Sequence, residues 1–63
     1  MRVGTKVRVL DNNVAPNLTG SNGVVIWRRA KKWVRLRIDD HREPFGPSGK
    51  GWFFPTTAIE RIK

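Results

Sequence analysis

Residues 22–39, NGVVIWRRAKKWVRLRID, determine how the rest of the chain is interpreted. Positions 24–27 and 33–38 are rich in β-branched and aromatic residues, and positions 34–38 alternate apolar with charged side chains. An alternation with a period of two predicts a strand that has one buried and one solvent-facing side. We therefore predict two antiparallel strands joined by a short turn. The outward side of the second strand would carry Trp33, Arg35 and Arg37.

The turn and the outward side of this hairpin are strongly basic. Positions 28–37 hold six of the chain's 13 Lys and Arg residues, and no Asp or Glu occurs between positions 12 and 38. A net charge of +8 on 63 residues predicts an anionic partner, and the clustering favours a dedicated basic surface over an even, solubilising scatter. The side chains predicted to contact nucleic acid are Trp27, Arg28, Arg29, Lys31, Lys32, Trp33, Arg35, Arg37 and Lys50.

Outside the hairpin, the sequence predicts three more short strands. They are residues 5–10, 52–55 and 59–62, the last preceded by one helical turn at 56–58. The intervening stretches 11–22 and 40–51 are rich in Gly, Pro, Asn and Asp, a composition typical of loops. We expect Leu18 to be buried beneath the first loop and Phe45 to anchor the second.

These segments predict an all-β fold, a small five-stranded SH3-like barrel that forms a single domain over residues 1–63. A barrel suits so short a chain because closure removes exposed sheet edges and lets few residues enclose a core. The predicted core is Val7, Val9, Val24, Ile26, Val34, Leu36, Ile38, Phe54, Ala58 and Ile59.

Composition excludes several classes of site. The chain has no cysteine, so it can form neither a disulfide nor a thiolate metal site. It contains no apolar run near the ~20 residues that a membrane-spanning helix requires, and it shows no signal-peptide pattern, so we expect a cytoplasmic protein without membrane insertion. No cofactor motif is present. Residues 46–51, GPSGKG, lack the Walker spacing, which leaves Lys50 as an auxiliary phosphate contact.

Two stretches resemble known barrel families. Residues 3–9, VGTKVRV, and 20–25, GSNGVV, resemble the start of many bacterial SH3-like and KOW-like domains. Residues 54–62, FPTTAIERI, resemble the C-terminus of the plasmid-borne type II dihydrofolate reductases, which also build an SH3-like barrel.

The reductase resemblance does not extend to the active site. In that family a Val-Gln-Ile-Tyr run lines a pore between subunits and binds cofactor and substrate, and this chain has Gly51, Trp52, Phe53 and Phe54 at those positions. The amide and the phenol that would contact the ligands are absent, so we expect no enzymatic activity. A related alternative is an oligomeric ligand-binding barrel whose subunits meet through Trp52 and Phe53.

The basic hairpin itself allows more than one interpretation. Its cations would follow a phosphate backbone while Trp33 and Trp27 stack on unpaired bases, which favours single-stranded DNA or RNA with low sequence specificity. Alternatively, the two Trp form a cross-strand pair that only stabilises the hairpin. A third interpretation is an adaptor that docks an acidic protein. The chain resembles, in this respect, small accessory subunits of photosynthetic complexes, some of which carry a Trp-Phe-Phe near the last strand.

A polar cluster at Asp39, Asp40, His41 and Glu43 suggests either a metal site or an acid–base pair. An Asp that ends a strand and is followed by polar turn residues is far more common, so we assign this cluster to the turn. No catalytic or metal-binding residue is predicted.

Overall fold

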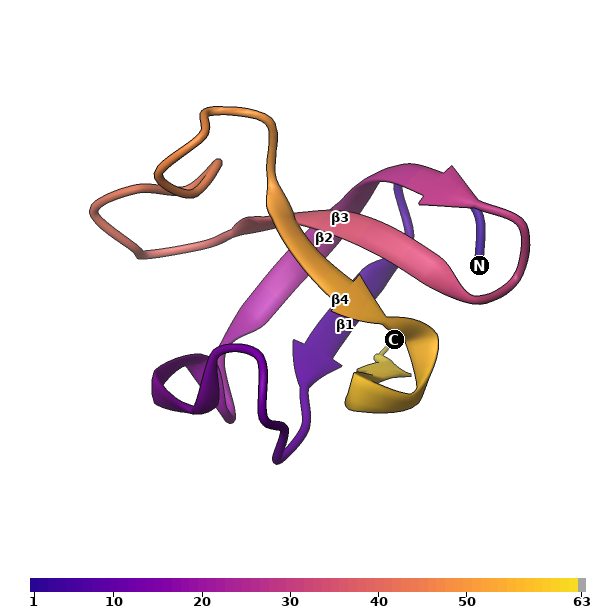
Figure 1. Cartoon of the computed structure of the whole chain (residues 1–63), viewed down its shortest axis with the longest axis horizontal. Coiled ribbons are helices and arrows are strands. Elements are labelled where there is room, and N and C mark those ends of the chain that lie inside the picture. Colours follow the sequence, from indigo (N-terminus) through magenta and orange to yellow (C-terminus); the bar gives the residue numbers. More distant parts are fainter. Residues whose placement is uncertain (63) are drawn as a thin grey trace.

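The five strands form one antiparallel sheet in the order β4-β3-β2-β1-β5 (Figure 1). The computed structural model describes residues 1–62. Its elements are β1 (Lys6–Val9), η1 (Pro16–Leu18), β2 (Asn22–Arg29), β3 (Trp33–Ile38), β4 (Trp52–Pro55), η2 (Thr56–Ala58) and β5 (Ile59–Arg61). The prediction of an all-β, five-stranded domain is confirmed. The 3₁₀ turn η2 joins the two outermost strands, so the sheet curls into a barrel-like form. Kinship with the SH3-like and KOW-like families stays a prediction.

The inner side of the curled sheet encloses one apolar core. It consists of Val7, Val9, Ala15, Leu18, Val25, Val34, Leu36, Ile38, Phe54, Ala58 and Ile59. Leu18 is buried under the first loop, as expected from the sequence. The placement of Val24 and Ile26 in the core is wrong: both are half-buried, and Val25 occupies the core in their place.

A β-bulge in β2 explains part of this difference. Val25 pairs with Leu36 on β3, and the next pair joins Trp27 to Arg35, so Ile26 is an extra residue without a partner. Unbroken alternation from the buried Val25 would direct Trp27 into the core. Because the bulge adds one residue, Trp27 instead reaches the outer face beside Arg35.

The sequence suggested that Phe45 anchors the loop between β3 and β4, but the structure shows that Trp52 holds this loop. Phe45 is 44% exposed. Trp52 is half-buried against the core, its Nε1 donates to the carbonyl oxygen of Glu43 at 2.9 Å, and its ring meets His41 edge-on at 5.2 Å. An indole suits this position because it combines a large apolar body with one polar donor.

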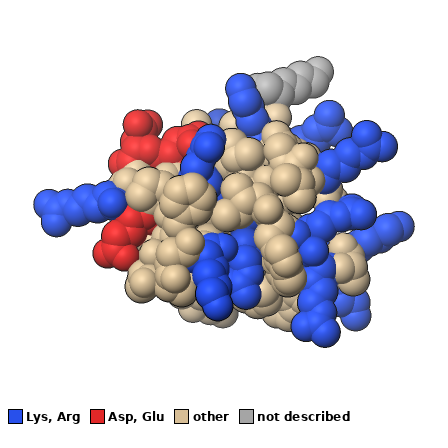
Figure 2. Space-filling view, turned by 90° about the horizontal axis from the view of Figure 1, so that it is seen from above, with Lys and Arg blue, Asp and Glu red and all other residues tan. Residues whose placement is uncertain are grey.

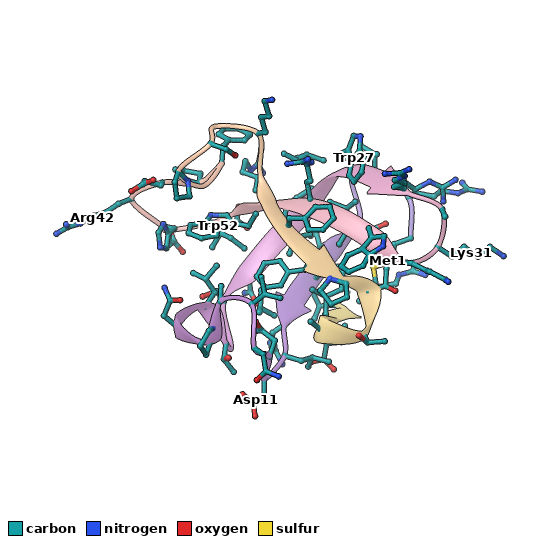
Figure 3. All side chains as sticks on the ribbon, viewed as in Figure 1. Met1, Asp11, Trp27, Lys31, Arg42 and Trp52 are labelled. Carbon is teal, nitrogen blue, oxygen red and sulfur yellow. The ribbon has the colours of Figure 1, made fainter. Side chains whose placement is uncertain are left out.

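The loop and the β2–β3 turn lie at opposite ends of the molecule, as Figure 1 shows with the loop at the left and the turn at the right. Met1 packs against the core at the turn end, and Trp52 packs against it at the loop end (Figure 3). Within residues 1–62 there is no helix with the length and apolar character needed to cross a bilayer.

Candidate functional site

Three aromatic side chains gather on the outer face of the sheet, one from each of three neighbouring strands. Trp33 of β3 and Phe53 of β4 stack with ring centroids 5.0 Å apart and planes inclined by 15°. Trp27 of β2 lies 6.2 Å from Phe53 at 40°. These three rings, called here the aromatic cluster, remain 36% (Trp27), 39% (Trp33) and 41% (Phe53) exposed. The cluster is therefore an aromatic surface open to solvent.

Arg35 places its guanidinium group over two of these rings. The strand register pairs Arg35 with Trp27 on one side and with Phe53 on the other. Its Cζ lies 5.0 Å from the Trp27 ring centroid and 5.3 Å from that of Phe53. Both distances fall within the range of cation–π attraction. The positive charge of Arg35 is thus held beside the rings.

The next row of the outer face, toward the turn, adds a further cation. Here the register pairs Trp33 with Arg29 on β2 and with Pro55 on β4. Arg29, Lys31 and Lys32 are all exposed. Three more positive charges therefore follow the aromatic cluster toward and into the β2–β3 turn.

The backbone of that turn is tied to η2 by Thr56. The N–H of Thr56 donates to the carbonyl oxygen of Lys32 at 2.9 Å, and its Oγ1 donates to that of Lys31 at 3.0 Å. These bonds join the backbone of the two lysines to the first residue of η2, which directly follows β4. The lysine side chains therefore extend from a supported backbone and not from a loose loop.

The remaining predicted contacts lie apart from the cluster. Arg28 pairs with the buried Val34, which places it on the inner side of β2, and its Nη1 donates to the carbonyl oxygen of Met1 at 3.3 Å. Arg37 is on the outer face, but its Nη2 lies 3.7 Å from Oδ1 of Asp39, so its charge is partly compensated. Lys50 is exposed in the β3–β4 loop.

Phe53 was absent from the predicted nucleic-acid contacts, although alternation along a strand at 52–55 places it on the side opposite Trp52 and Phe54. The structure confirms this alternation, since Phe54 is buried while Phe53 belongs to the cluster. The register also shows that Trp27 and Trp33 are not a direct cross-strand pair, because their partners on the facing strands are Arg35 and Arg29. Phe53 connects them instead.

Charge is distributed unevenly over the face of the molecule that Figure 2 shows. In Figure 2 the red acidic side chains gather at one end, while most of the blue Lys and Arg side chains lie toward the other end, with tan side chains among them. Within the described residues, no three His, Cys, Asp or Glu side chains come together as a metal site would require. His41 has a structural contact, since its Nδ1 accepts the N–H of Glu43 at 3.0 Å.

Comparison with models of protein families, with curated proteins and with solved structures finds no match to this chain.

Proposed function

We propose that this protein is a non-enzymatic module that binds single-stranded nucleic acid through the aromatic cluster and the cations around it. The observation that carries this proposal is the placement of three exposed rings on adjacent strands, with the Arg35 guanidinium over two of them. Clustered exposed aromatic surface in a small domain marks an interaction site more often than isolated apolar residues do. The rings would stack on bases, and the cations would contact phosphates.

The geometry favours unpaired bases over a duplex. The cluster lies on the outer surface of a sheet, and the described residues include no helix that could enter a major groove. Bases in a duplex are stacked on one another, whereas unpaired bases are free to stack on Trp33 or Trp27. Every base has an aromatic face, so binding of this kind is weakly selective for sequence.

The experiment is a tryptophan-fluorescence titration with single-stranded DNA, RNA, duplex DNA and polyglutamate across a range of salt concentrations. We expect quenching by both single strands and weaker quenching by the duplex. Four cations adjoin the cluster, namely Arg29, Lys31, Lys32 and Arg35. Their combined contacts would give a slope of log affinity against log salt of about −3 for single strands.

The polyglutamate arm separates the two classes of partner. Polyglutamate has negative charge but no bases, so it reproduces only the electrostatic part of the interaction. Equal quenching and affinity with polyglutamate would contradict the proposal and assign the surface to an acidic protein partner. Failure of every ligand to bind at physiological salt would also contradict it.

A further inference from the structure

A second cationic site lies at the end of the barrel beneath the β2–β3 turn. A hollow of about 470 Å³ is lined there by Met1, Arg2, Thr5 and Arg61. Met1 also packs against the core, and Figure 3 shows it on the side of the molecule that carries the turn. The aromatic cluster contributes no residue to this hollow.

The strand register explains why cations line the opening. Arg61 of β5 pairs with the buried Val7 of β1, so both residues belong to the inner side of the sheet. Thr5 precedes Val7 by two residues and therefore shares that side. The inward-facing side chains of β1 and β5 are apolar in the core and become polar at this opening, where Thr5 and Arg61 stand. Openings of β-barrels are common positions for ligand sites.

A tight turn brings Arg2 to the same place. The N–H of Thr5 donates to the carbonyl oxygen of Arg2 at 3.1 Å, and Gly4 within the turn has φ of +93°. Glycine adopts this conformation without steric cost. The turn is also fixed to β2, since the N–H of Gly4 donates to the carbonyl oxygen of Val25 at 2.7 Å. Arg2 is thus positioned by backbone hydrogen bonds beside Thr5.

In the described part of the chain, the two arginines of the hollow have no acidic partner. Among residues 1–62 the ion pairs are Arg8 with Glu60 and Arg37 with Asp39. Glu60 precedes Arg61 but lies on the opposite side of β5, where it pairs with Arg8. The described residues that line the hollow are thus two arginines, Thr5 and Met1, and none of them has a side-chain carboxylate.

We propose that this hollow binds a phosphomonoester. Arginine presents a planar set of donors that matches phosphate oxygens, and the threonine hydroxyl adds another donor. A phosphomonoester carries a charge of about −1.5 to −2 at neutral pH, so two arginines attract it more strongly than a singly charged phosphodiester. The hollow's volume falls within the roughly 300–1,000 Å³ typical of small-molecule sites. This inference does not depend on the function proposed for the aromatic cluster.

The test is a titration of the ¹⁵N-labelled protein with phenyl phosphate, followed by NMR, with dimethyl phosphate as the diester control. We expect saturable shifts of the Arg2, Thr5 and Arg61 amides with the monoester and at least tenfold weaker binding of the diester. Arg61→Gln and Arg2→Gln should each weaken monoester binding at least tenfold. Arg42→Gln, an exposed arginine in the β3–β4 loop, is the matched control and should leave the affinity unchanged.

Three results would overturn the proposal: no saturable shift at the hollow, equal affinity for the diester, or equal weakening by Arg42→Gln. The amide spectrum of each variant checks that it is folded. A second arm identifies the source of the phosphate by comparing 5′-phosphorylated and 5′-hydroxyl dodecanucleotides. Tighter binding of the phosphorylated strand supports the proposal and indicates a strand end as the ligand. If phenyl phosphate binds saturably but the 5′-phosphorylated and 5′-hydroxyl strands bind with equal affinity, the proposal is supported and the ligand is a free small molecule.

Discussion

Trp33 and Phe53 stack diagonally across the β3–β4 pair, with ring centroids 5.0 Å apart and planes inclined by 15°. Their direct partners in the register are different, since Trp33 faces Pro55 and Phe53 faces Arg35. Phe53 therefore contacts Trp33 along one diagonal and Arg35 directly across, while Trp27 lies 6.2 Å from it. This single phenylalanine holds the aromatic cluster together.

Phe53→Ala should lower the free energy of unfolding by about 1 to 2 kcal/mol. The substitution removes both aromatic contacts of the cluster, and such pairs contribute about 0.5–1.5 kcal/mol each beyond buried area. Urea unfolding followed by circular dichroism measures the change. Phe45→Ala is the control because Phe45 is similarly exposed and has no ring contact within the described residues. Equal losses for the two variants would contradict the role given to Phe53.

Arg35→Ala should reduce the salt dependence of nucleic-acid binding by one phosphate contact. The expected change in the slope of log affinity against log salt is about 0.7 for a single strand. Fluorescence titrations at several salt concentrations provide the slope. Arg42→Ala, in the β3–β4 loop and away from Trp27 in Figure 3, should leave it unchanged. An unaltered slope in Arg35→Ala would mean that this guanidinium does not contact phosphate.

Gly51→Ala should destabilise the fold and disturb the aromatic cluster together. Gly51 has φ of +108°, and a Cβ there would lie 2.8 Å from Cδ1 of Ile26 and 3.0 Å from Cβ of Arg35. Backbone strain and crowding should together cost about 1–3 kcal/mol. Gly49→Ala separates the two effects, because Gly49 also has positive φ but an added Cβ would meet nothing within 4 Å. We expect Gly49→Ala to lower the free energy of unfolding less than Gly51→Ala does. An equal decrease for the two variants would exclude the steric contribution.

Thr56→Val should loosen the β2–β3 turn at a cost of about 1 kcal/mol or less. The substitution removes the hydroxyl that donates to the carbonyl oxygen of Lys31 at 3.0 Å, and a hydrogen bond contributes about 0.5–1.5 kcal/mol in proteins. Amide hydrogen exchange of the turn should accelerate. Thr57→Val is the matched control, since no side-chain hydrogen bond involves Thr57 within the described part of the chain. Unchanged exchange in Thr56→Val would show that the turn is stable without this bond.

The sequence predicted β3 and its two sides correctly because a strict alternation from Val34 to Ile38 leaves one solution. It predicted β2 as a strand but assigned the sides of that strand wrongly. All four residues at 24–27 are apolar, so their sequence does not show which of them face the core. Only the pairing with β3 reveals the bulge. Phe45 and Trp52 show a similar limit. Both are aromatic, but the position of Trp52 opposite the buried Leu36 gives it the inner side of the sheet.

The candidate site was partly predictable for the same reason. Trp33 and Arg35 follow from alternation within one strand. Phe53 joins them only because β4 pairs with β3 in a particular register, and Arg28 leaves the outer face only because the bulge reverses the sides of β2. The hollow between Arg2 and Arg61 joins residues from the two ends of the described chain, a proximity that no local pattern encodes.

The central claim is that the aromatic cluster binds unpaired bases. The most direct test compares the affinities of the Phe53→Ala and Phe45→Ala proteins for one single-stranded dodecanucleotide at physiological salt. Stacking of one base contributes about 1–3 kcal/mol, so loss of one stacked base predicts a roughly 5- to 150-fold weaker complex for Phe53→Ala. Phe45→Ala should bind like the unmodified protein. Equal affinity of both variants and the unmodified protein would contradict the claim.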